Sequence, residues 1–158
     1  MSASGDSETV PAVTNSTCLI GLERSERLDI LAQVFSSITI PTAVSTEVGF
    51  EADWLTVRPV QNLALVAILK TQVDEGEAEA ISLAMELEDV FLILEDRKAR
   101  QLALQLNLKV IGTVGMLLRA KRKGIITEIK PLLVALNQAN FRISEPLIQN
   151  ALRIAGEL

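Results

Sequence analysis

Acidic and amide side chains follow several segments of this chain that are predicted to be buried strands. They are Asn15, Glu47, Glu77, Glu79, Glu95 and Asp96. Hard divalent cations such as Mg²⁺ and Mn²⁺ prefer carboxylate and amide oxygens as ligands. Two carboxylates about 5 Å apart repel each other by roughly 3 kcal/mol at an effective dielectric near 20, so a cluster of them favours a bound cation. The alternative interpretation is that each acid is a solvated residue at the start of a helix.

The composition excludes several other kinds of site. The chain of 158 residues has no histidine, no tyrosine and a single cysteine, Cys18. Without histidine there is no Ser-His-Asp triad, no Cys-His pair and no His-ligated zinc or iron. The two common glycine-rich loops that bind phosphates are also missing. Any catalysis must therefore use carboxylates, hydroxyls, Lys or Arg side chains, or a hard metal ion.

Strands and helices are predicted to alternate along the chain. Apolar, β-branched segments predict strands at residues 10–15, 37–40, 54–60, 90–95 and 108–112. Helical spacing of apolar residues predicts helices at 18–35 (two segments hinged near 24–26), 42–50, 62–71, 75–87, 96–106, 114–123, 128–140 and 145–157. This alternation favours an α/β domain with a mostly parallel sheet, in which polar residues that follow strands converge at the carboxyl edge.

Local signals predict particular details of these elements. Asp74 is expected to cap the helix that follows it, and Thr113 to cap the helix at 114–123. Ser16 and Thr17 are expected to cap the first helix, or else to support a site beside Asn15. The strand at 54–60 is expected at the sheet edge, because Pro59 cannot donate a hydrogen bond. The strand at 108–112 is expected to be buried.

The ends of the chain and its hydropathy suggest a cellular setting. Residues 1–9 are predicted to be a disordered lead-in, and residues 10–158 to form one domain. No apolar run approaches the roughly 18 residues that a membrane helix needs. The polar, acidic first residues lack the features of a secretion signal. We therefore expect a cytoplasmic protein that does not associate with membranes.

The net charge of −5 is divided unevenly along the chain. Residues 1–96 carry 17 acidic and 4 basic side chains, whereas residues 97–158 carry 3 acidic and 11 basic ones. This asymmetry indicates either an acidic pocket with a separate basic binding surface or two halves that attract each other.

Five segments together resemble the PIN-domain superfamily, and come closest to a prokaryotic branch related to VapC-type toxin nucleases. They are VTNSTCLIGLERSERLDIL, ITIPTAVSTEV, DEGEAEAISLAMEL, LILEDRKARQLA and VIGTVGMLLRAKRKGII. The resemblance implies a three-layer α/β/α sandwich around a mostly parallel sheet. It also implies a ribonuclease that uses Mg²⁺ or Mn²⁺ to hydrolyse RNA phosphodiester bonds, as the toxin of a toxin–antitoxin pair. Such proteins commonly form homodimers, for which the apolar segment 63–69 is a candidate face, and bind an antitoxin protein.

The resemblance also assigns roles to the acidic residues. Asn15 falls on the first acidic position of the family, Glu47 on the second, Glu77 or Glu79 on the third and Asp96 on the last. Glu77 is the favoured third position because it directly follows Gly76. Glu95 is either a further ligand or an outward-facing neighbour. The family has Asp where this chain has Asn15, so one negative charge is lost. The alternative function is therefore a catalytically impaired PIN-fold protein that binds a partner protein or RNA.

Basic residues of the second half are the expected RNA contacts, because an acidic pocket repels RNA until metal is bound. Arg97 is expected either to contact a phosphate or to pair with Glu95. The other candidates lie in the segment 119–123 and are Arg119, Lys121, Arg122 and Lys123. The alternative interpretation of that segment is favourable charge at a helix C-terminus beside Gly124.

Overall fold

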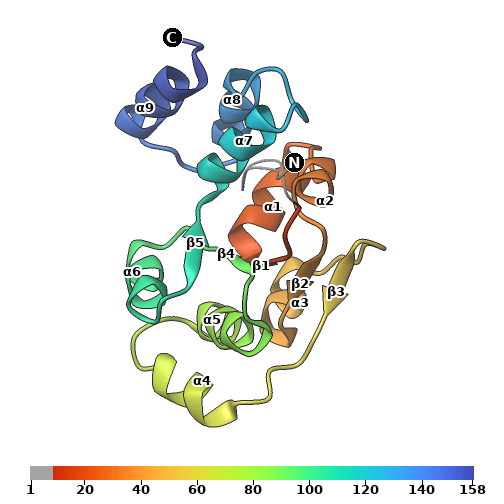
Figure 1. Cartoon of the computed structure of the whole chain (residues 1–158), viewed down its shortest axis with the longest axis vertical. Helices are drawn as coiled ribbons and strands as arrows, with labels where there is room; N and C mark the ends of the chain where they lie inside the picture. The colour runs from red at the N-terminus through yellow and green to blue at the C-terminus, as the bar shows by residue number, and fades with distance from the viewer. Residues whose placement is uncertain (1–8) are drawn as a thin grey trace, which may run out of the picture.

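The computed structural model describes residues 9–158, in which five parallel strands form one sheet (Figure 1). The strands are β1 (Ala12–Thr14), β2 (Ile38–Ile40), β3 (Leu55–Val57), β4 (Phe91–Ile93) and β5 (Lys109–Ile111). Their order across the sheet is β3-β2-β1-β4-β5. The predicted lead-in at residues 1–9 lies outside the described residues, apart from Thr9.

Helices cover both faces of this sheet. They are α1 (Ser16–Arg24), α2 (Asp29–Val34), α3 (Thr42–Val48), α4 (Leu63–Leu69), α5 (Glu75–Leu87), α6 (Arg97–Gln105), α7 (Thr113–Arg122), α8 (Lys130–Gln138) and α9 (Glu145–Ala155). In Figure 1, α7, α8 and α9 gather at one end of the molecule, and α4 lies at the opposite end.

Alternate residues of the central strands point to two separate hydrophobic cores. Ala12 and Ile93 face a core built with α1, α2, α3, α7, α8 and α9. Val13 and Leu92 face the other core, built with α4, α5 and α6. The sequence of a strand that is buried on both faces is a continuous run of apolar residues, as in segment 90–95. The structure is therefore a three-layer α/β/α sandwich with a parallel sheet, as predicted.

The strand order changes direction beside β1. The chain runs from β1 to β2 and β3 on one side, and then places β4 and β5 on the other side of β1. Val13 pairs with Thr39 of β2 and with Leu92 of β4. In open parallel sheets, ligands bind at the carboxyl ends of the strands where the order reverses. In this sheet that point lies between the ends of β1 and β4.

Most predicted elements are confirmed, and three local details are wrong. The edge position of β3 is confirmed by the strand order. β5 is also an edge strand, so Lys109 is exposed and its two neighbours are only partly buried. Thr113 is the first residue of α7 and not its cap, which is Gly112. The residue that precedes α1 is Asn15, so neither Ser16 nor Thr17 caps that helix.

The helices of residues 9–158 are too short or too polar to cross a membrane. The longest of them, α5, has 13 residues, whereas a membrane-spanning helix needs about 20.

Candidate active site

Asn15 lies directly at the point where the strand order reverses. It follows β1, and its backbone N–H donates to the carbonyl of Ile93 on β4 over 3.2 Å. The residue is only 4% exposed. Within residues 9–158, its side-chain Oδ1 has no hydrogen-bond partner. A buried polar atom without a partner costs on the order of 1–3 kcal/mol, so this oxygen is a strong candidate for binding a ligand.

Asp96 lies at the end of the neighbouring strand β4. Its side chain caps α6, because Oδ2 accepts a hydrogen bond from Ala99 N over 3.0 Å. This bond fixes the orientation of the carboxylate and uses only one of its two oxygens. Asp96 is exposed to solvent. The cap therefore holds Asp96 at the carboxyl edge of the sheet with one oxygen available for a ligand.

Two further carboxylates are fixed by the start of α5. Asp74 Oδ1 accepts from Glu77 N over 2.8 Å, and Glu77 Oε1 accepts from Asp74 N over 3.2 Å. This reciprocal arrangement is a capping box, which satisfies two amides that the helix itself cannot. The cap predicted at Asp74 is confirmed. The same contacts hold Asp74 and Glu77 beside each other at the positive end of the helix dipole.

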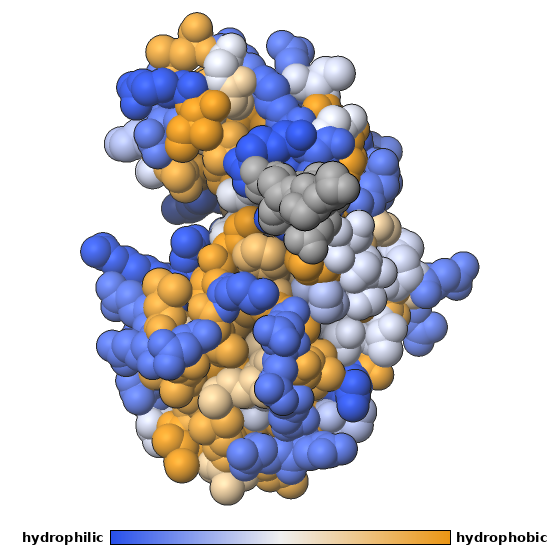
Figure 2. Space-filling model, in the orientation of Figure 1, coloured by the Kyte–Doolittle hydropathy of each residue, from blue (hydrophilic) through white to orange (hydrophobic). Residues whose placement is uncertain are grey.

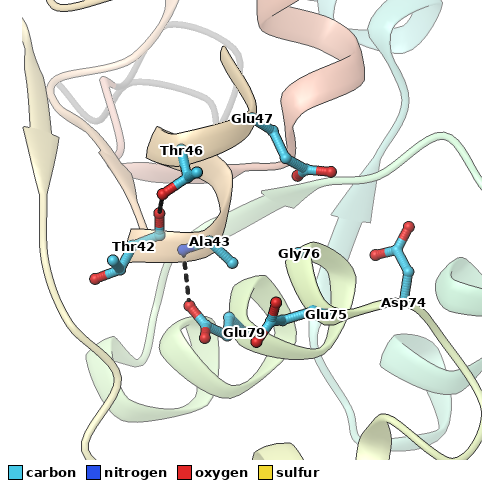
Figure 3. Close-up of a pocket in the computed structure, with 8 residues that line it drawn as sticks. All are labelled: Thr42, Ala43, Thr46, Glu47, Asp74, Glu75, Gly76 and Glu79. Atoms are coloured by element: carbon cyan, nitrogen blue, oxygen red, sulfur yellow. Dashed lines mark hydrogen bonds between the residues drawn. The ribbon is translucent and has the colours of Figure 1, made fainter. Parts of the chain in front are cut away.

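Glu47 reaches this helix start from α3, because Gly76 has no side chain. A Cβ on Gly76 would lie 2.5 Å from Glu47 Oε1, which is too close for any real side chain. Figure 3 shows the carboxylates of Glu47 and Asp74 on the same side of Gly76. They line a cavity of about 510 Å³ between α3 and α5. Glycine at this position therefore permits the close approach of the two helices.

Electrostatics connect these acids to Asp96. The pKa of Glu77 is raised to about 7, first by partial burial and then by the negative charges of Asp74, Asp96 and Glu47, against the lowering effect of its hydrogen bond to Asp74. These charges come from α3, the start of α5 and the start of α6. The charges of Glu47 and Asp96 thus both act on Glu77, as does that of Asp74, which sequence reasoning treated only as a cap. Its position three residues before Glu77 was the available signal.

Glu79 lines the same cavity but performs a different task. Its Oε1 accepts a hydrogen bond from the backbone N of Ala43 over 3.0 Å (Figure 3). Ala43 lies in the first turn of α3, where backbone amides have no partner within the helix. Glu79 therefore stabilises the start of α3. Of the two candidates for the third acid, Glu77 is the one on which the charges of Asp96 and Glu47 act.

Glu95 faces away from these acids and toward α7. Its Oε2 accepts hydrogen bonds from Thr113 N over 2.8 Å and from Thr113 Oγ1. Burial raises the pKa of Glu95, while Thr113 and the positive charge of Arg100 lower it. The cation near Glu95 is therefore Arg100, and the predicted pairing with Arg97 is wrong. Arg97 is an exposed residue in the first turn of α6.

The segment 119–123 is not a continuous basic surface, which corrects the sequence-based interpretation. Arg119 is only 6% exposed, and its guanidinium lies 4.8 Å from the ring centre of Phe91. Lys121 forms an ion pair with Glu157 over 2.8 Å. Lys123 Nζ donates to the carbonyl of Val34. These contacts hold α7 against the sheet and the C-terminal helix, so of the four basic residues only Arg122 is exposed.

The donor atoms at the reversal point fit a hard divalent cation in chemical type. All of them are oxygens, and one of them (Asn15 Oδ1) has no partner among residues 9–158. Within residues 9–158, however, no three acidic side chains are spaced to hold a metal ion. The site therefore has oxygen donors of a suitable type that are not arranged as a metal site.

Comparison with known proteins identifies the fold. No match was found among the curated proteins. A family model described as a PIN domain, DUF3368, matches residues 11–157. The matched region includes all of the strands and every acidic residue described above. PIN domains are generally metal-dependent nucleases. Because the match covers nearly the whole chain, the chain belongs to the PIN-domain family.

Proposed function

We propose that this protein is a metal-dependent endoribonuclease whose site is formed by Asn15, Glu47, Glu77 and Asp96. The observation that carries the proposal is the buried amide oxygen of Asn15, which has no hydrogen-bond partner among residues 9–158 and lies at the end of β1, the strand that pairs with β4. The charges of Glu47 and Asp96, which come from separate elements, act on Glu77. Such an arrangement costs stability in a folded protein and is retained where a ligand offsets the cost. Glu79, the remaining metal-ligand candidate, is proposed to act by holding α3 in place.

The residues of the chain have distinct tasks in this mechanism. Asn15, Glu47, Glu77 and Asp96 would hold Mg²⁺ or Mn²⁺, which supplies an activated water and neutralises charge on the scissile phosphate. Asp96 is oriented by its bond to Ala99 N, and Glu47 by its approach to Gly76. Glu77 loses its proton near neutral pH, which completes the negative charge of the site.

Cleavage of RNA by purified variants tests this function. We expect wild type to cleave RNA with Mn²⁺ or Mg²⁺, and Asp96→Asn and Glu77→Gln each to lose at least about 100-fold of the rate, as is usual when charge stabilisation of a transition state is removed. Glu128→Gln is the control, because Glu128 is exposed and does not line the cavity beside Glu47. Equal cleavage by wild type and the two site variants would indicate contamination and reject the proposal.

We further propose a narrower biological role, as a cytoplasmic VapC-related toxin that binds an antitoxin protein and forms a homodimer. The exposed apolar side chains of α4 support the dimer, because Leu63 is 70% exposed and Ile68 is 63% exposed. Large apolar side chains exposed together often mark an interface. A monomer by light scattering at tens of micromolar would contradict the dimer. The absence of growth inhibition on expression, with cleavage intact in vitro, would contradict the toxin role.

Asn15 supports a second candidate function. An amide in place of a carboxylate lowers the negative charge of the site, which weakens the attraction for a divalent cation. The chain would then be a catalytically impaired PIN domain that binds RNA or a protein. RNA binding by wild type without cleavage, together with cleavage gained by Asn15→Asp, is the result that this function predicts.

A further inference from the structure

Three adjoining cavities lie along α1, α6 and the C-terminal helices. Their volumes are about 230, 330 and 290 Å³. The first two share Thr17, Asn140 and Phe141, and the last two share Glu95, Arg100, Val114 and Leu147. They therefore form one continuous depression from α1 to α9. Figure 2 shows the surface hollowed where this depression ends, between α9 and α6.

This depression is positively charged overall. Arg24, Arg142 and Arg100 line it in succession, and we call it the arginine groove. Among the described lining residues the only acid is Glu95. Glu95 is largely buried, and Oε2 of its carboxylate is engaged by Thr113. The excess of positive charge is therefore available to an anionic ligand.

The guanidinium of Arg100 is held in a position that suits binding of an anionic ligand. A Cβ added to Gly112 would lie only 2.6 Å from Arg100 Nη1. The guanidinium therefore packs against the backbone at a residue that has no side chain. The side chain is partly buried, and its positive charge acts on Glu95. A guanidinium held in place in this way is suited to bidentate binding of a phosphate.

The groove also passes close to Asp96, one of the acidic residues of the site. Arg100 lies four residues after Asp96 on α6, and the backbone N of Arg100 donates to the carbonyl of Asp96 over 2.9 Å. Residues spaced in this way are neighbours on one helix face. Thr17, which lines the groove, is two residues after Asn15. A linear polyanion in the groove would thus pass directly beside the carboxyl ends of β1 and β4.

We propose that the arginine groove binds the sugar–phosphate backbone of the RNA strand, with Arg100 and Arg142 holding phosphates next to the one that is cleaved. This inference rests on the proposed ribonuclease function and assigns its substrate-binding surface. It replaces the segment 119–123 in that role, because those side chains hold α7 in the fold. It also explains how an acidic protein can attract RNA to an acidic site.

RNA affinity measured without metal tests the groove separately from cleavage. Anisotropy of a short fluorescent single-stranded RNA in EDTA would be followed for wild type, Arg100→Gln, Arg142→Gln and the control Arg153→Gln. Arg153 is exposed on α9 and does not line the groove. We expect each groove variant to weaken binding roughly tenfold and to reduce the slope of log K against log salt by about 0.7, the value for one lost phosphate contact to a single strand. Arg153→Gln should retain the wild-type affinity and slope.

A structural effect of Arg100 on Glu95 must give a different pattern. If Arg100 served only to neutralise Glu95, Arg100→Gln would lower the melting temperature but leave the salt slope unchanged. Arg100→Lys should keep the slope, because the charge remains, and lose affinity, because the bidentate geometry is lost. Groove variants that bind RNA like wild type would overturn the inference.

The binding and cleavage experiments distinguish an error in the groove proposal from an error in the nuclease proposal. Normal RNA binding through the groove without any metal-dependent cleavage would reject the nuclease and keep the groove. Cleavage that depends on Asp96 and Glu77, with unchanged affinity in Arg100→Gln and Arg142→Gln, would reject the groove and keep the nuclease. Binding of the double variant at the level of wild type would show that another surface attracts RNA.

Discussion

The acidic site and the basic segment 119–123 were the two charged features of the sequence, and their side chains have different surroundings in the fold. The acids come from α3, α5 and α6 and are far apart in sequence, yet the charges of Glu47 and Asp96 both act on Glu77. The basic residues are contiguous in sequence, yet Arg119 lies on Phe91 and Lys121 pairs with Glu157. Charge that the fold neutralises contributes to stability, whereas charge that it gathers without a partner indicates a ligand.

The largest effect on stability is expected in the basic segment. Arg119→Ala should lower the free energy of unfolding by about 3 kcal/mol, because it removes a buried side chain and its contact with the Phe91 ring. Lys98→Ala is the control, since Lys98 is exposed on α6 and should cost less than about 0.5 kcal/mol. Urea unfolding measures both. Equal losses would mean that Arg119 behaves as an exposed surface residue, contrary to the comparison above.

In the acidic site, adding charge should destabilise the protein. Asn15→Asp places a carboxylate at a position that is only 4% exposed, so we expect a loss of about 2 kcal/mol without metal. Millimolar Mn²⁺ should reverse this loss and raise the melting temperature more than in wild type. Asn62→Asp adds the same charge at the exposed cap of α4 and should change little. A Mn²⁺ response that is the same in wild type and both variants would contradict a cation site at Asn15.

A double-mutant cycle measures the contact between Gly76 and Glu47. Gly76→Ala places a Cβ 2.5 Å from Glu47 Oε1, which should offset the usual helical gain of about 1 kcal/mol for alanine over glycine. In a Glu47→Ala background the same substitution should regain that stability. Because Glu47 is exposed and its carboxylate can rotate away from the new Cβ, we expect a coupling free energy of no more than about 1 kcal/mol between the two positions. Additive effects would show that Glu47 does not approach α5 as described.

The smallest effect concerns the pH dependence of stability. The pKa of Glu77 is raised from 4.5 to about 7, so the folded protein binds this proton more tightly than the unfolded chain does. Stability should therefore fall as the pH rises from about 4.5 to 7, and Glu77→Gln should remove that part of the dependence. Because the side chain is only partly buried, we expect a difference of less than about 1 kcal/mol at pH 8. Unfolding by urea at pH 5 and pH 8 tests this, and a Glu77→Gln variant that loses as much stability as wild type over this range would contradict it.

The sequence predicted the fold well because its signals are local. Apolar runs such as 90–95 identify buried strands, and Asp74 with Glu77 identifies a helix start, without knowledge of distant residues. The rule that parallel strands share one carboxyl edge predicted that Glu47, Glu77 and Asp96 lie near each other, and the charges of Glu47 and Asp96 do act on Glu77.

The details that the sequence did not predict depend on contacts between distant residues. Arg119 and Lys121 look exposed in a basic stretch until Phe91 and Glu157 are brought beside them by the fold. Arg100 gave only a weak signal, its spacing of four residues from Asp96. Its role depends on Gly112 and on cavities that form only when the C-terminal helices pack.

The capping box of α5 links ion capture to the local order of a helix. Glu77 is the carboxylate whose Oε1 accepts from Asp74 N and whose charge the other acids disfavour. A cation that turned this carboxylate away from Asp74 would release that amide. The exchange rate of the Asp74 amide proton would then rise when the cation binds, and it would report on occupancy of the site.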